Sequence, residues 1–175
     1  SGVGIGITGV NSGWINLSTN TVLQGSKYGV FIGTQAAGTQ VWLTSNTILP
    51  NNVSAVDAYG IYLDGLRTGA TIQNNGVFFR SSGGTAAMVR SAFYARTSSG
   101  VVLSNNRFSN PGMVTSGRVE LLRFDDADNT TFKFNDVYSS GTNLEAAYLI
   151  QFENDSTGAL VKNNVLVSSM SVGGG

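Results

Sequence analysis

A short motif, an asparagine set between apolar residues, recurs along the chain at nearly even intervals. Its copies read LSTNTV, LTSNTI, IQNNGV, LSNNRF, FKFNDV and VKNNVL. Subtraction gives spacings of 26, 29, 31, 29 and 29 residues between the central asparagines, which are Asn20, Asn46, Asn75, Asn106, Asn135 and Asn164. Self-similarity at this period is typical of solenoids, in which each copy of the repeat forms one structural unit.

Apolar residues stand at fixed distances from each asparagine, and their spacing predicts β-strands. The residue three positions before it and the residue two positions after it are apolar in every copy. The residue five positions before it is mostly apolar too, so one face repeats with a period of two. A second alternating run lies upstream in each copy: VGIGI, YGVFI, YGIYL, SAFYA, LLRF and LIQF. We therefore expect two or three short strands per repeat and no important helix, because no window shows a sustained 3.6-residue period.

A repeat of this size cannot bury its apolar side alone, so neighbouring repeats must stack. If each repeat is one coil, each strand pairs in parallel with its equivalents in the coils above and below, about 4.8 Å away. The sequence thus predicts an all-β, right-handed, single-stranded parallel β-helix of six coils, because parallel crossovers are almost always right-handed. We expect residues 1–175 to form one such domain.

The repeated asparagine is expected to stand at a sharp turn between two strands. Asparagine tolerates the left-handed backbone conformation better than other residues except glycine. Stacked turns would align the side-chain amides, and each amide could donate to the carbonyl of the next one along the axis. The sequence therefore predicts an asparagine ladder with a structural role.

These short β-runs, the N-N-x-apolar turn and the coil length resemble the right-handed parallel β-helix of the pectate-lyase-like group, which includes bacteriophage tailspikes. The resemblance covers essentially the whole chain. It implies an extracellular or virion-surface protein, a polysaccharide ligand and a parallel homotrimer. The fold hosts lyases, hydrolases, epimerases and non-catalytic adhesins, so the resemblance leaves the activity open. Asp125-Asp126 is similar to the paired aspartates of polygalacturonases, but the Gly-His-Gly and Arg-Ile-Lys elements of those enzymes have no counterpart here.

Aligning the upstream strands by their last inward residue places two columns of side chains on the outer face. The first column carries aromatic and then polar residues: Phe31, Tyr62, Tyr94, Arg123 and Gln151. The second column, past the strand ends, carries Asp64, Arg96, Asp125 and Glu153. Aromatic faces and hydrogen-bonding groups at such regular steps suit a linear polysaccharide. The alternative is that the aromatic rings simply stack on one another across the sheet.

Two carboxylates of the second column are candidates for catalysis. Asp125 and Glu153 fall in adjacent coils, so their carboxyl groups would lie about 5 Å apart, a separation that suits a retaining glycosidase. Asp64 and Asp125 are two coils apart, nearer the separation of an inverting enzyme. If the domain is a depolymerase, we expect Asp125 and Glu153 to be catalytic and Arg96 and Arg123 to orient the substrate. Arg96 stands between Asp64 and Asp125, however, and a surface ion-pair ladder explains that arrangement without chemistry.

Composition excludes several other functions. The chain has no histidine and no cysteine, so it lacks the commonest general base, the usual zinc ligands and any nucleophile that depends on histidine. The 10 basic and 10 acidic residues cancel, which argues against nucleic-acid binding. No apolar run approaches the roughly 20 residues of a membrane span. We expect no cofactor, no metal and no membrane insertion.

Two expectations concern partners. An apolar column directly after an inward one, formed by Leu23, Leu49, Phe78, Tyr138 and Val167, is a candidate for the trimer interface, although a broader core at that corner would also explain it. The first strand begins without a polar cap and SVGGG ends without one, so we expect the chain to be a fragment whose two ends are covered by further protein. The rival hypothesis for the whole chain is a structural shaft or adhesin scaffold that binds nothing.

Overall fold

The computed structural model describes residues 2–9, 13–23, 27–50, 57–79, 89–110 and 117–173. All regular structure in these residues is β-strand, as the period of two predicts. Sheet A contains β1 (Val3–Ile7), β4 (Tyr28–Ile32), β7 (Ala58–Asp64), β10 (Val89–Ser99), β13 (Arg118–Asp128) and β16 (Ala146–Glu153). Sheet B contains β2 (Trp14–Ser18), β5 (Gln40–Thr44), β8 (Ala70–Gln73), β11 (Val101–Ser104), β14 (Thr131–Lys133) and β17 (Leu160–Lys162). Sheet C contains β3 (Thr21–Leu23), β6 (Thr47–Leu49), β9 (Gly76–Phe78), β12 (Arg107–Asn110), β15 (Asp136–Leu144) and β18 (Val165–Val172).

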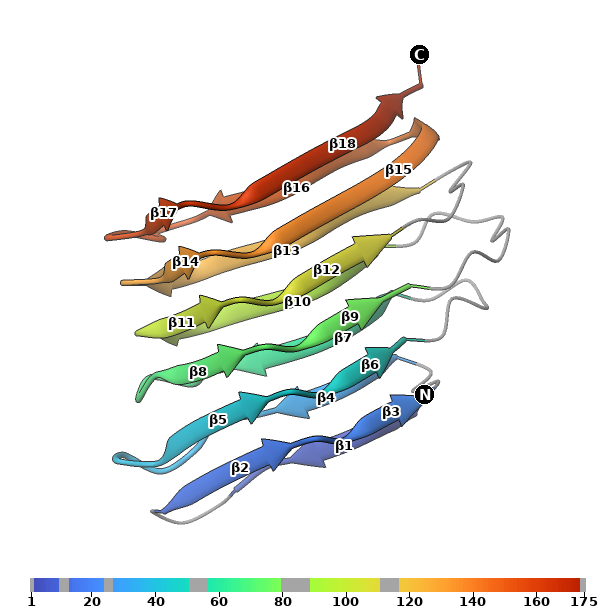
Figure 1. Cartoon of the computed structure of the whole chain (residues 1–175). Helices are drawn as coiled ribbons and strands as arrows, with labels where there is room; N and C mark the ends of the chain where they lie inside the picture. The colour runs from blue at the N-terminus through green and yellow to red at the C-terminus, as the bar shows by residue number, and fades with distance from the viewer. Residues whose placement is uncertain are drawn as a thin grey trace.

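Each coil of the chain contributes one strand to each sheet, and we call such a set of three strands a rung. Strands of successive rungs pair in parallel, for example β2 with β5 and β10 with β13. In Figure 1 the strands of sheets B and C run from left to right at the front, and those of sheet A return behind them. The chain climbs from the blue N-terminus to the red C-terminus, so the coil is right-handed. The predicted parallel β-helix is therefore confirmed.

The predicted asparagine ladder is present. The side-chain amide of Asn20 donates to Oδ1 of Asn46 at 2.9 Å, and the same bond continues through the ladder to Asn164 at distances up to 3.1 Å. Each Oδ1 also accepts the backbone N–H of the preceding asparagine in the ladder, as Asn106 Oδ1 does from Asn75 at 2.9 Å. The ladder thus satisfies buried backbone groups as well as its own amides.

The prediction that these asparagines adopt the left-handed backbone conformation is wrong by one residue. The left-handed backbone occurs at the residue before each ladder asparagine, which is Thr19, Ser45, Asn74, Asn105, Phe134 or Asn163, with φ between 54° and 57°. The ladder asparagine itself is selected by its buried amide, and the left-handed turn precedes it. Three residue types other than asparagine or glycine, namely threonine, serine and phenylalanine, take this strained position in some rung, because the stacked turns fix the backbone there.

Sheet A departs from strict alternation at one place in each rung. In β7, Tyr59 and Tyr62 lie on the outer face, while Gly60 and Ile61 between them both face the interior. A Cβ on Gly60 would meet the Val77 side chain of sheet C and lie 2.5 Å from the backbone oxygen of Ala92. Glycine is therefore required at this position, between the Val77 side chain and the backbone of β10, and the irregularity brings a second row of side chains to the outer face.

Candidate functional site

Strand register places the predicted outer-face residues in the two columns expected from the sequence. Phe31 pairs with Tyr62, and Tyr62 with Tyr94. The same column continues to Arg123 and Gln151. The second column pairs Asp64 with Arg96, Arg96 with Asp125 and Asp125 with Glu153. We call this second column the polar row.

The aromatic residues of the first column stack on one another. The rings of Tyr62 and Tyr94 are 4.7 Å apart with an angle of 12° between their planes. Tyr28 and Tyr59, which the sequence analysis missed, join them through the break in alternation, at 5.3 Å and 5.2 Å from Tyr62. Although they lie on the outer face, Tyr62 and Tyr94 are only 7% and 6% exposed. Most of their flat surface is therefore in contact with neighbouring rings, as the alternative interpretation proposed.

The hydroxyls of Tyr59 and Tyr94 in this stack are held protonated. Burial, reinforced by a hydrogen bond to Asp125, raises the pKa of Tyr94 well above its ordinary value. Burial, followed by the charge of Asp57, does the same to the pKa of Tyr59. The Tyr94 hydroxyl donates to Oδ2 of Asp125 at 2.9 Å. Tyr94 is thus a hydrogen-bond donor to the polar row and not a base near neutral pH.

Arg123 connects the stack to the acidic residues. Its guanidinium lies over the Tyr94 ring, 4.6 Å from the ring centre. Its Nη1 lies 3.4 Å from Oε2 of the buried Glu120, and its Nε pairs with Glu153. Arg118 contacts the other oxygen of Glu120 at 2.5 Å. Arg123 is therefore committed to two carboxylates and one aromatic face.

The two candidate catalytic carboxylates lie side by side, and both are already hydrogen-bonded. Asp125 accepts hydrogen bonds from Tyr94 and from the side chain of Asn154. Glu153 is paired with Arg123, and Nε2 of Gln151 lies 3.5 Å from its Oε2. These contacts orient both side chains. The arrangement contains an ion-pair network, although it is centred on Arg123 and not on Arg96 as the sequence analysis considered.

Arg96 is the cation of the polar row that is open to solvent. It is exposed, and it hydrogen-bonds the Tyr62 hydroxyl. Among the described residues it forms no ion pair with Asp64 or Asp125, its neighbours in the row. Its guanidinium can therefore donate several hydrogen bonds to a ligand.

Two pockets lie where sheet A turns into sheet B, directly after the polar row. The larger, which we call the corner pocket, has a volume of about 480 Å³ and includes Gly65 and Thr97, which follow Asp64 and Arg96 in the chain. The smaller, which we call the Trp42 pocket, has a volume of about 310 Å³. Thr68 lines both pockets, so the polar row, the corner pocket and the Trp42 pocket follow one another around the corner.

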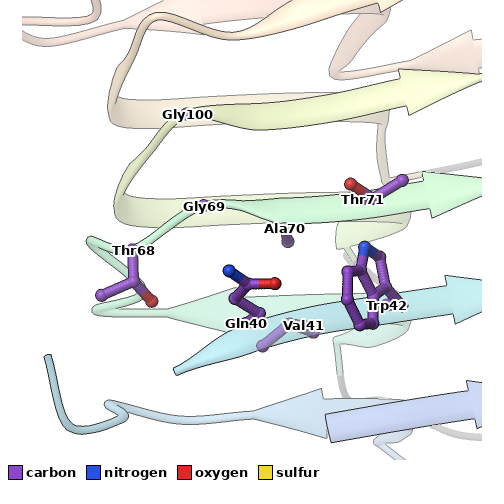
Figure 2. Close-up of a pocket in the computed structure, with 8 residues that line it drawn as sticks. All are labelled: Gln40, Val41, Trp42, Thr68, Gly69, Ala70, Thr71 and Gly100. Carbon is purple, nitrogen blue, oxygen red and sulfur yellow. The ribbon is translucent and has the colours of Figure 1, made fainter. Parts of the chain in front are cut away.

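Figure 2 shows how the Trp42 pocket is built. The side chains of Gln40 and Trp42 come from β5, and Thr71 of β8 lies above the indole. Thr68 closes the opposite side, and the backbone of Gly69 and Gly100 borders the pocket without a side chain. The sequence gives little sign of this site, because the turn residues that complete its wall, Thr68, Gly69 and Gly100, have no periodic spacing. The outward-facing Trp42 was the one available indication.

The fold defines the class of the protein: a parallel β-solenoid with an internal asparagine ladder. Comparisons of the chain with known protein families, with curated proteins and with solved structures gave no match. The described residues form no helix that is long and apolar enough to cross a membrane. In the same part of the chain, no group of three or more His, Cys, Asp or Glu side chains could hold a metal ion.

Proposed function

We propose that this chain is an extracellular, polysaccharide-recognising β-helix domain, of the kind found in a phage tailspike or fibre. The observation that supports this most is the polar row: Asp64, Arg96, Asp125 and Glu153 in register on four successive rungs, beside two pockets. An extended polymer lying across the strands would meet one of these groups about every 4.8 Å. Carboxylates accept from sugar hydroxyls and the Arg96 guanidinium donates to them, so the row offers both kinds of partner.

The aromatic stack has a supporting role in this proposal. Because Tyr62 and Tyr94 are buried against their neighbours, they present ring edges and a hydroxyl to a ligand. Phe31, at the end of the column, is only partly buried and packs against Tyr28 and Tyr62. The stack thus supports the polar row from one side. Arg96, Asp64 and Gln151 supply polar contacts at its surface, and Arg123 orients the substrate indirectly, by holding Glu153.

Replacement of Arg96 with alanine tests the proposal. We expect wild-type protein to bind at least one bacterial surface polysaccharide on a glycan array, and Arg96→Ala to weaken that binding by about tenfold or more, since a charge-assisted hydrogen bond is lost. Arg107→Ala is the matched control, because Arg107 is exposed on sheet C, far along the rung from the row. Equal affinities of the two variants would contradict a role for the polar row, and a wild-type protein that binds no glycan would favour the structural-shaft hypothesis.

The proposal of depolymerase activity rests on the pair Asp125 and Glu153. Their register in adjacent rungs places two oriented carboxylates at one point of the row. We expect Asp125→Asn and Glu153→Gln each to lower the release of shorter chains from a bound polysaccharide by about a hundredfold or more, with binding retained. Chromatography of the products measures this. Full activity in both variants would exclude the pair, and a wild-type protein that binds without cleaving would be an adhesin.

The resemblance to tailspikes also leads us to propose a parallel homotrimer. Its candidate interface is the apolar column on the outer face of sheet C, formed by Leu23, Leu49, Phe78, Tyr138 and Val167. Leu23, Tyr138 and Val167 are 59%, 39% and 47% exposed in the single chain. Such a column is available for contact with another subunit.

A further inference from the structure

We infer that the Trp42 pocket binds a single neutral pyranose unit of a saccharide. This inference rests on the proposed function, and it names the class of ligand for a pocket close to the polar row. The pocket is small: about 310 Å³, at the lower limit of ligand pockets. It shares Thr68 with the corner pocket, which begins beside the polar row. A polymer lying on the row could thus place one sugar ring here, at the corner.

The indole of Trp42 supplies the apolar wall that a pyranose needs. It lies on the outer face of β5 and is only partly buried. Trp14 packs its ring against it in an edge-on arrangement, with ring centres 4.4 Å apart and planes at 65°. This contact fixes the orientation of the Trp42 indole without covering both of its faces. A flat aromatic face of this kind suits the C–H face of a sugar ring.

Around this wall stand neutral hydrogen-bonding groups. The Gln40 amide can both donate and accept, and the Thr71 hydroxyl can do the same. The Thr68 hydroxyl donates its proton to the backbone oxygen of Thr39 at 2.6 Å, so this hydroxyl can only accept from a ligand hydroxyl, through its lone pairs. Gly69 and Gly100, both with positive φ, let the backbone border the pocket where a side chain would fill it. Sugar hydroxyls, which donate and accept, match this set.

The absence of charge among the residues that line the pocket sets its specificity. None of them carries a charged side chain, whereas Arg67 lines the adjacent corner pocket. A uronic or sialic acid in the Trp42 pocket would lose hydration of its carboxylate and find no cation in the wall, which is costly. A neutral hexose or deoxyhexose loses only hydroxyl hydration, and the neighbouring polar groups replace it.

Tryptophan fluorescence offers a direct test, because Trp14 and Trp42 are the two tryptophans of the chain. In the Trp14→Phe protein, Trp42 is the sole tryptophan, and excitation beyond the tyrosine absorption band selects its emission. We expect at least one of the methyl pyranosides of glucose, galactose, mannose and rhamnose to change this emission saturably in the millimolar range. Glucuronic acid and N-acetylneuraminic acid should bind about tenfold more weakly or not at all.

Saturation-transfer NMR with the wild-type protein and its variants provides the control. Trp42→Ala should weaken binding of the responding pyranoside by about tenfold or more, while Trp14→Phe, which keeps an aromatic ring against the Trp42 indole, should leave most of it. Thr71→Val, nearly isosteric, should also weaken binding because it removes a hydroxyl. Circular dichroism checks that each variant is folded.

The outcomes separate this inference from the proposed function. If a polysaccharide binds in an Arg96-dependent way but no pyranoside binds, or Trp42→Ala has no effect, the inference about the pocket fails alone. Tighter binding of the anionic sugars would also overturn it. If pyranosides bind at Trp42 while no polymer binds the wild-type protein, the pocket stands and the proposed function fails.

Discussion

Replacing Asn106 with alanine is expected to lower the free energy of unfolding by about 4 kcal/mol, because it opens the asparagine ladder at its centre. Asn106 is 2% exposed. Its amide donates to the backbone oxygen of Ile72 at 2.8 Å and to Oδ1 of Asn135 at 3.0 Å. Its Oδ1 accepts from both the backbone N–H and the side-chain amide of Asn75. Alanine supplies none of these bonds.

The size of the effect comes from the partners that remain. The buried N–H of Asn75 loses its acceptor, and each buried polar group left without a partner costs about 1–3 kcal/mol. Urea unfolding followed by circular dichroism measures the loss, as a lower transition midpoint.

Asn105 provides a matched control one residue away. It is exposed, has a φ of 54° and lies outside the ladder. Asn105→Gly should change the free energy of unfolding by less than about 0.5 kcal/mol, because glycine adopts this conformation without strain. If Asn106→Ala were as mild as Asn105→Gly, the ladder would not be a main source of stability.

The sequence predicts the ladder well and its turn less well, for a physical reason. A buried amide has few substitutes, so asparagine recurs in every rung and its column is visible by inspection. The left-handed position beside it tolerates Thr19, Ser45 and Phe134 as well as asparagine, because stacking of the turns fixes the backbone. In IQNNGV and LSNNRF both positions are asparagine, so the sequence does not distinguish the ladder position from the left-handed position.

Prediction of the outer face from the sequence is limited in a similar way. The polar row and the first aromatic column follow from alternation alone, and the register confirms them. Tyr28 and Tyr59 were missed because alternation breaks at Gly60, which a period of two cannot anticipate. The Trp42 pocket depends on how two turns and two strands meet in space, and the periodic pattern of the sequence does not predict this arrangement.

The same break in alternation leads to the second large effect that we expect. Gly60→Ala should lower the free energy of unfolding by about 3 kcal/mol or more, because the added methyl group would meet the Val77 side chain and lie 2.5 Å from the backbone oxygen of Ala92. A side chain can rotate away, but the Ala92 oxygen belongs to β10 and cannot move without shifting a paired strand. Urea unfolding again measures the change.

Two further variants identify the cause of this loss. Ala92, which stands at the equivalent position in the next rung, is fully buried, so Ala92→Gly removes a methyl group and should cost only about 1 kcal/mol. Combining Gly60→Ala with Val77→Ala removes one of the two clashes, and the double variant should recover part of the loss expected from adding the two single effects. Strict additivity would mean that the methyl group does not reach Val77. In that case the close approach of sheets A and C would not be what keeps a glycine between Tyr59 and Ile61, and the outward position of Tyr59 in the aromatic stack would need another explanation.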